Sequence, residues 1–305
     1  MLVLPRLVSP EQCDAWQGEF WETIGASPEQ PESWPGDYTN PGAVPVDWGM
    51  PFVQRGESLS DYPPLQGILD QLMGEGKHRR GLRPPNKKFG ETDERKETDC
   101  MTVNWPEEDG ATWEPPAGGH VEGGNGTKDG WKGGFMMGAI TYLADVEEKG
   151  GKCSRSLCVF LCASEKRLPG SFFFWPRSHR AAHEYFKQHP ECINPNEHGH
   201  PGWNVETLSS MAGGYPEQPR EWLGQKGDTI LWHHWTVHQG SSNVLDFPRI
   251  ALFARWYHAD TEEMRYDIGG IQSDGDLWKY WAPAVREQPP APTQTMDEVM
   301  EAARL

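Results

Sequence analysis

The sequence predicts a mainly β protein whose core is a two-sheet jelly roll, a double-stranded β-helix, with flanking helices. Three observations predict this class. From residue 101 onward, several short apolar and aromatic segments are each bounded by turn-forming residues. The 15 tryptophans suit pleated surfaces, on which large flat side chains pack well. The 34 glycines and 27 prolines favour turns over long uniform helices, and many short strands with such turns are typical of a jelly roll.

The 305 residues read as a single enlarged domain, because the chain has no long Ser/Gly linker and no internal repeat. We expect a jelly-roll core over about residues 100–258. A region of helices and loops, 1–99, precedes it, and an extension, 259–305, follows it.

Two helices are predicted before the core. Ser9, Pro10 and Gln12 form a helix start, with a capping hydroxyl and a proline at the first helical position; this helix should end near Ile24. Residues 26–64 are predicted to form an ordered loop, and 64–73 a short helix.

The one basic cluster of the chain runs from Lys77 to Lys88. Its Gly and Pro content predicts a loop. The simplest interpretation is a solvated segment. The alternative is a lid that attracts an anionic substrate or the carboxylates of a cosubstrate.

The predicted strands follow in order: 101–105, 135–143, 171–175, 229–233, 237–241 and 249–257. Pro176 should end the third of them. Ser178 is then expected to cap a helix that starts there. A terminal helix is predicted over 295–304.

The formal charge of -17 argues against a nucleic acid or an anionic membrane as partner, since both are polyanions. A small-molecule substrate is the expected partner.

No apolar run is long enough to span a bilayer, and the first residues lack the order of a signal peptide. The six cysteines contain no CxxC pair, which predicts thiols and no structural disulfide. We therefore expect a cytoplasmic protein. A peroxisomal location is the alternative, because Ala303-Arg304-Leu305 is a conservative variant of the peroxisomal targeting signal Ser-Lys-Leu.

Three residues have the chemistry of a non-haem iron site. His120 and Glu122 are two positions apart, so an extended segment projects both side chains to the same side. His238 lies far along the chain at the start of a later strand. Two imidazoles and a carboxylate suit Fe(II) and leave positions open for dioxygen and a cosubstrate. Arg249 begins the next strand, where its guanidinium can hold a carboxylate in a bidentate pair.

In their order along the chain, these residues resemble the phytanoyl-CoA dioxygenase family. The matching motifs, over about residues 118–257, are Gly-His-Val-Glu-Gly, Ile-Thr-Tyr-Leu-Ala-Asp-Val, Phe-Trp-Pro-Arg-Ser-His, Gly-Asp228, His238 and Arg249. The resemblance implies that His120, Glu122 and His238 bind Fe(II) and that Arg249 anchors 2-oxoglutarate. Ser241 is implied as a weaker cosubstrate contact, with no catalytic residue beyond the metal ligands. The implied reaction is a hydroxylation that consumes 2-oxoglutarate and dioxygen.

The chain departs from the family pattern at two places. Family members usually have Asp at the position of Glu122, and the extra methylene moves the carboxylate outward. Residues 151–169 form an insert where the family runs directly into the next strand. This insert is interpreted either as a retained intron or as a surface loop.

Other functions compete with the oxygenase. A cupin-like metal hydrolase or isomerase would use the same ion as a Lewis acid and would not need Arg249. A non-catalytic jelly-roll protein, a pseudoenzyme disabled by Glu122 or by the insert, would not consume 2-oxoglutarate.

His179 and His183 are one helical turn apart and could bind zinc, although packing roles are favoured. Trp232 is expected in the core, with a smaller chance of lining the substrate pocket.

Overall fold

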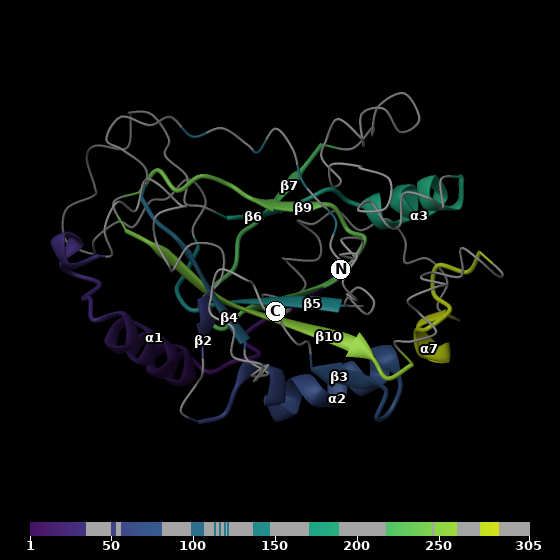
Figure 1. The fold of residues 1–305 in the computed structure, drawn as a ribbon, viewed down its shortest axis with the longest axis horizontal. Helices are drawn as coiled ribbons and strands as arrows, with labels where there is room; N and C mark the ends of the chain where they lie inside the picture. Colours follow the sequence, from purple (N-terminus) through teal and green to yellow (C-terminus); the bar gives the residue numbers. More distant parts are fainter. Residues whose placement is uncertain are drawn as a thin grey trace, which may run out of the picture.

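Two antiparallel sheets face each other in the computed structural model, and helices cover the outer face of the larger sheet (Figure 1). The structure describes residues 1–34, 50–52, 56–80, 99–106, 113, 116, 119, 121, 137–146, 171–188, 218–245, 247–260 and 275–286. Within these residues the expectation of a mainly β, two-sheet architecture with flanking helices is confirmed. The double-stranded β-helix connectivity stays a prediction.

The larger, seven-stranded sheet has the order β1-β8-β5-β10-β4-β2, with β3 paired to β10. Its strands are β1 (Leu2–Leu4), β2 (Met50–Phe52), β3 (His78–Arg80), β4 (Asp99–Asn104), β5 (Met137–Tyr142), β8 (Thr229–His233) and β10 (Arg249–His258). The smaller sheet, β7-β6-β9, consists of β6 (Phe172–Phe174), β7 (Arg220–Trp222) and β9 (His238–Gly240). The helices are α1 (Pro10–Ile24), α2 (Pro63–Met73), α3 (Ser178–Gln188) and α7 (Pro283–Arg286), with single turns at Pro31–Ser33 and Leu59–Asp61.

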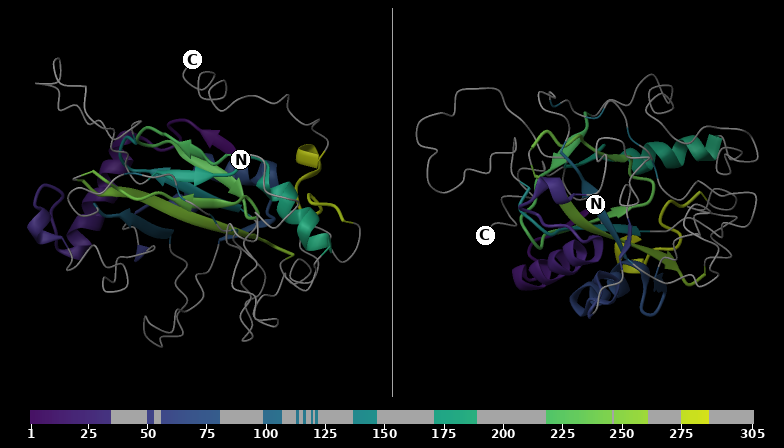
Figure 2. Two further views of the ribbon diagram at one scale, coloured as in Figure 1. Left: turned by 90° about the horizontal axis from the view of Figure 1, so that it is seen from above. Right: turned by 60° about the vertical axis from the view of Figure 1, so that its left-hand side comes forward.

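Helix α1 forms where the sequence predicts it. The Ser9 hydroxyl accepts a hydrogen bond from the backbone N of Gln12, and Gly25, in the left-handed conformation, ends the helix. Trp16 and Phe20 are buried in the core cluster that this helix shares with α2 and the larger sheet. Both helices lie on the same side of that sheet (Figure 2).

The strand β10 separates two apolar cores by alternation. Ile250, Leu252 and Ala254 belong to the core under α1 and α2. Ala251 and Phe253 belong to the second core, which includes residues of the smaller sheet. Successive side chains of a strand point to opposite faces. The odd-numbered positions of β10 therefore face the space between the sheets, and we call this side the inner face.

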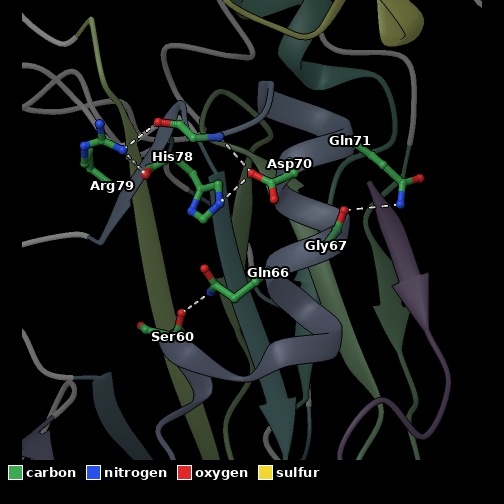
Figure 3. Close-up of polar contacts among 8 residues, drawn as sticks. Ser60, Gln66, Gly67, Asp70, Gln71, His78 and Arg79 are labelled. Carbon is green, nitrogen blue, oxygen red and sulfur yellow. Dashed lines mark hydrogen bonds and ion pairs between the residues drawn. The ribbon is translucent and has the colours of Figure 1, made fainter.

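The prediction of a loop from Lys77 onward is wrong for residues 78–80, which form β3. Asp70 of α2 accepts a hydrogen bond from the backbone N of Gly76, at 3.1 Å. It also contacts Nε2 of His78, at 3.0 Å (Figure 3). These contacts hold the turn after α2, so that β3 meets the end of β10. The rest of the basic cluster, and with it the proposed lid, lies outside the described residues.

Several elements escaped the sequence prediction. The strands β1, β2 and β7 have three residues each, too few to show a periodic pattern. The strand β2 and two single helical turns lie within the span predicted as loop. Strands β1, β2 and β3 also come from the region before residue 100, and they complete the larger sheet.

Ser178 begins α3 as predicted, but its hydroxyl has partners outside the helix. It donates to the carbonyl of Trp175 at 2.7 Å and accepts from the backbone N of Val237 at 2.8 Å. Its expected capping role is thus replaced by a contact that ties α3 to the start of β9.

Other expectations lie outside the described residues. These are the insert at 151–169, the terminal helix at 295–304 and the C-terminal tripeptide. In the part of the chain that the structure describes, no helix combines the length and apolarity needed to cross a bilayer. Cys13 is a buried free thiol, and burial raises its pKa to about 12.

Candidate functional site

His238, the first residue of β9, lies between the two sheets. Its ring stacks on Phe172 at a centroid distance of 5.3 Å and lies 5.1 Å from the ring of Trp232. Its Nδ1 atom is 2.9 Å from the carbonyl oxygen of Thr236, which assigns the proton to Nδ1. That tautomer has its lone pair on Nε2, as a metal-binding histidine requires.

His120 and Glu122 lie outside the described residues, but Gly119 and Val121 are described. A Cβ atom on Gly119 would lie 2.8 Å from Cγ1 of Val237 and 2.9 Å from the carbonyl oxygen of His238. Val121 is buried in the same cluster as Val237. The two described neighbours of His120 therefore pack beside the start of β9.

Arg249 begins β10 at an inner-face position, next to Tyr142 of β5. The guanidinium Cζ lies 5.8 Å from the centroid of the Tyr142 ring, and the two side chains are hydrogen-bonded. Burial lowers the pKa of Arg249, and the neighbouring Tyr142 opposes this shift. Burial likewise raises the pKa of Tyr142. The raised pKa keeps the Tyr142 hydroxyl protonated near neutral pH, and an arginine guanidinium is not deprotonated in proteins.

The guanidinium of Arg249 has unused donors. Its Nε and Nη1 atoms are buried and have no hydrogen-bond partner within the described ranges. Burying N–H groups of a cation without an acceptor is costly, so such groups indicate a binding site for an anion. A carboxylate matches this donor pair in shape and charge. The residues present therefore fit the distal carboxylate of 2-oxoglutarate.

Tyr142 connects this arginine to His238, and the sequence reasoning did not single it out. Its hydroxyl accepts from the backbone N of Phe172 at 3.0 Å, and the ring of Phe172 stacks on His238. Tyr142 is paired with Ala251, two positions from Arg249 on the same face. Only the strand register could have revealed this neighbour.

Ser241 lies just after β9 and is buried. Its hydroxyl accepts from the backbone N of Ser171 at 2.9 Å and donates to the carbonyl of Ser242 at 3.3 Å. These bonds hold the end of β9 against the start of β6. A contact of Ser241 with the cosubstrate stays a prediction.

The remaining histidines form a separate aromatic cluster. His233 stacks on Trp281, with ring centroids 5.4 Å apart, and His179 lies 5.5 Å from His233. His183 packs on Trp235. Among the described residues, no group of three or more potential ligands could hold a metal ion. His179 and His183 thus contact aromatic rings, in agreement with the packing interpretation.

No family model matches the chain, and no curated protein matches it in sequence. Among solved structures, the chain is similar to the non-heme α-ketoglutarate-dependent carbocyclase SnoK from nogalamycin biosynthesis, with 14% identity and a TM-score of 0.43 over 84% of this chain and 78% of SnoK. It is also similar to the epimerase SnoN in complex with Fe3+, α-ketoglutarate and nogalamycin RO, with 16% identity and a TM-score of 0.46 over 84% of this chain and 78% of SnoN. A third similar structure is HygX from Streptomyces hygroscopicus with nickel and 2-oxoglutarate bound, with 15% identity and a TM-score of 0.41 over 84% of this chain and 81% of HygX. Likeness at this level establishes neither a fold nor an activity, so a function has to be inferred from the residues of the site.

Proposed function

We propose that this chain is an Fe(II)/2-oxoglutarate-dependent dioxygenase of the phytanoyl-CoA dioxygenase family, with a double-stranded β-helix core. It hydroxylates a small-molecule or lipid-like substrate. His120, Glu122 and His238 bind Fe(II), and Arg249 binds the distal carboxylate of 2-oxoglutarate.

The observation that carries this proposal is the guanidinium of Arg249. It is a buried cation with two unused N–H donors on the inner face, joined through Tyr142 and Phe172 to the stacked ring of His238. A Lewis-acid hydrolase or isomerase would have no use for such a group. The packing of Gly119 and Val121 beside the start of β9 adds support for a shared site with His120.

Each residue of the site has a distinct task. The Thr236 carbonyl orients the His238 ring and determines its tautomer. Arg249 and Tyr142 orient the cosubstrate through its carboxylate. The buried aromatic rings of Phe172, Trp232 and Phe253 exclude water from the space between the sheets. When bound, Fe(II), 2-oxoglutarate and dioxygen would supply the oxidant for hydroxylating a C–H bond.

The test combines binding with turnover. The purified chain is loaded anaerobically with Fe(II), 2-oxoglutarate affinity is measured by calorimetry, and succinate is measured after oxygen is admitted. We expect Arg249→Gln to weaken 2-oxoglutarate binding by at least about tenfold, because a charge-assisted bidentate pair is lost. Arg249→Lys should recover only part of the affinity, since an ammonium cannot form the fork. His238→Ala should weaken metal binding itself.

Arg180→Gln is the matched control, because Arg180 is an exposed residue of α3 and its loss changes the net charge equally. Equal 2-oxoglutarate affinity in wild type and Arg249→Gln would refute the cosubstrate assignment. Bound iron and 2-oxoglutarate without any succinate would point to the pseudoenzyme. Bound iron without 2-oxoglutarate affinity would point to the Lewis-acid enzyme.

A further inference from the structure

The turn between β8 and β9 carries the carbonyl group that orients His238. The strand β8 ends at His233 in the larger sheet, and β9 begins at His238 in the smaller sheet. The chain therefore crosses from one sheet to the other over residues 234–237. Thr236 lies in this turn, and its carbonyl oxygen is 2.9 Å from Nδ1 of His238. The orientation of the His238 ring thus depends on how the backbone of Thr236 is held.

His233 holds this turn at two points. Its carbonyl oxygen accepts a hydrogen bond from the backbone N of Thr236 at 2.8 Å. Its side-chain Nδ1 atom accepts from the backbone N of Trp235 at 3.1 Å. Asn and Asp side chains close turns in the same way, by accepting from the backbone N two residues further on. One histidine therefore binds the N–H groups of two consecutive residues, and one of these is Thr236 itself.

The last residue of the turn, Val237, is held by the segment between β6 and α3. Its backbone N donates to the hydroxyl of Ser178 at 2.8 Å, and its carbonyl accepts from the backbone N of Trp175 at 2.9 Å. Each backbone N–H group from Trp235 to Val237 thus has an acceptor. The acceptors for the first two of these groups both belong to His233, so the hold of β8 on the turn depends on this residue.

The protonation state of His233 suits an acceptor. Burial lowers its pKa well below the usual value, so the ring is neutral near neutral pH. Because Nδ1 accepts a hydrogen bond, the proton of the neutral ring belongs on Nε2. This Nε2 atom is buried and has no hydrogen-bond partner among the described residues. Within that part of the chain, the imidazole of His233 therefore forms hydrogen bonds only as an acceptor.

Stacked rings hold the plane of the His233 imidazole. Trp281 stacks on it at an interplanar angle of 12°, and His234 at 20°, with centroids 5.4 Å and 4.3 Å away. The neighbour of Trp281, Ala282, donates its backbone N–H to the carbonyl of Leu72 in α2 at 2.9 Å. Packing against a segment anchored to α2 thus fixes the ring that carries the Nδ1 acceptor.

We propose that His233 is a positioning residue for the metal ligand His238, and that it acts through Thr236. The two acceptors of His233 fix the turn so that the Thr236 carbonyl meets Nδ1 of His238. The proton of His238 is then held on Nδ1, and the lone pair is on Nε2, the nitrogen that would bind the metal. This inference rests on the proposed function and adds to it a residue that acts through the backbone rather than as a ligand.

The test compares two substitutions with opposite losses. His233→Phe keeps a ring for stacking and removes the acceptor. His233→Asn loses the ring and keeps a side-chain acceptor for the N–H group two residues further on. The Mn(II) affinity of the full chain is measured by calorimetry. We expect His233→Phe to weaken it about threefold to tenfold, because partners behind a ligand influence metal affinity. His233→Asn should stay within about twofold of wild type, because it restores the turn.

His258 offers a matched control within the chain. It ends β10 as His233 ends β8, it is also buried, and its Nδ1 accepts from the backbone N of Asp260 at 3.1 Å. The bond lost in His258→Phe is therefore of the same kind and length, but its turn carries no proposed metal ligand. His258→Phe should leave the Mn(II) affinity unchanged. An equal loss of affinity in the two Phe variants would overturn the proposal.

The tautomer of His238 is a second readout that needs no metal. NMR of the imidazole nitrogens in the metal-free chain shows which nitrogen carries the proton, and His238→Gln identifies the signals of His238. We expect the Nδ1–H tautomer in wild type and in His233→Asn, and a mixture of tautomers in His233→Phe. His233→Leu removes the same acceptor with a smaller side chain and should give the same mixture, so the result does not depend on the folding of one variant.

The two readouts separate the inference from the proposed function. The proposal is overturned if His233→Phe and His233→Leu keep the wild-type tautomer, or if His233→Asn loses it as they do. Equal Mn(II) affinity in wild type and His233→Phe would also overturn it. A wild-type chain that binds no Mn(II), but in which the His238 tautomer depends on His233 as expected, would keep the positioning role and reject the metal site.

Discussion

Gly119 lies in close contact with the chain segment that leads into β9 and His238. A Cβ atom there would be 2.6 Å from the Trp175 ring and 2.8 Å from Val237. Real Cβ atoms do not approach this closely, so a side chain would move the segment away from β9. The glycine before His120 is thus required by a close approach of two chain segments, which a count of glycines cannot reveal.

Gly119→Ala is expected to lower the free energy of unfolding by about 1–3 kcal/mol, the usual cost of overpacking. It should also weaken metal binding, because the segment with His120 is displaced. Urea unfolding and Mn(II) titration measure the two effects. Gly240→Ala is the control, since a Cβ atom there would meet nothing within 4 Å. Equal losses in the two variants would contradict the close-approach argument.

At the site, the predictable residues were those with recognisable chemistry. His238 and Arg249 could be selected from the sequence because an imidazole and a guanidinium follow each other at the starts of successive strands. Tyr142 could not be selected in this way, and Trp232 is predicted mainly as a core residue, because in the sequence each resembles an ordinary core aromatic residue. The role of Tyr142 depends on Arg249, which lies beside it. The role of Trp232 depends on the neighbouring ring of His238.

At the scale of elements, local sequence signals predicted where helices begin and end. They did not predict which distant strands pair with each other. Ser9, Pro10 and Gln12 predicted the start of α1 correctly, because a helix cap acts within one helical turn. The Gly and Pro content of the basic cluster predicts a loop for residues 78–80. This segment becomes β3 only because β10 offers an open edge for pairing.

Helix α3 meets β8 through the histidine cluster, and this junction should respond to pH. Burial lowers the pKa of His179 to about 3 and lowers that of His233 well below its usual value. The α-amino group of Met1 and the neighbouring His234 and His183 act in the same direction. Both histidines are therefore neutral in the folded protein at neutral pH.

A folded-state pKa below the unfolded value means that the unfolded chain binds more protons. This contribution to stability is complete above about pH 6.5 and is lost as the pH falls toward 3. We expect roughly 1–2 kcal/mol of the free energy of unfolding to be lost for His179 between pH 6.5 and pH 5. Urea unfolding at several pH values measures this loss. His179→Gln should flatten the dependence; an unchanged slope in that variant would refute the assignment.

At the scale of the whole molecule, Tyr142 joins the two sheets. It belongs to β5 of the larger sheet, yet its hydroxyl accepts from Phe172 of β6 and donates to the carbonyl of Trp222 of β7, at 3.2 Å. Its ring also stacks on Trp222, with centroids 4.2 Å apart. One buried side chain thus links strands of both sheets and supports Arg249.

Tyr142→Phe keeps the stacked ring and removes the hydroxyl, which leaves the buried N–H of Phe172 without its acceptor. We expect a loss of about 1–3 kcal/mol in the free energy of unfolding, together with weaker 2-oxoglutarate binding. Urea unfolding and calorimetry measure these effects. Tyr62→Phe is the matched control and should change the free energy of unfolding by less than about 0.5 kcal/mol. A neutral Tyr142→Phe would show that the sheets do not depend on this link.

The sequence by itself determined the class of the fold, the ends of α1 and α2, most strands from residue 101 onward, and the histidine and arginine of the candidate site. These features depend on caps, alternation and side-chain chemistry, which are local. The tertiary structure decided which strands are neighbours. Pairing brings Tyr142 beside Ala251, Gly138 between Trp232 and Arg255, and Gly119 against His238. Such contacts join residues separated by roughly a hundred positions along the chain. Strand register depends on how the side chains of two strands are buried together on one face. No local sequence pattern therefore predicts these contacts.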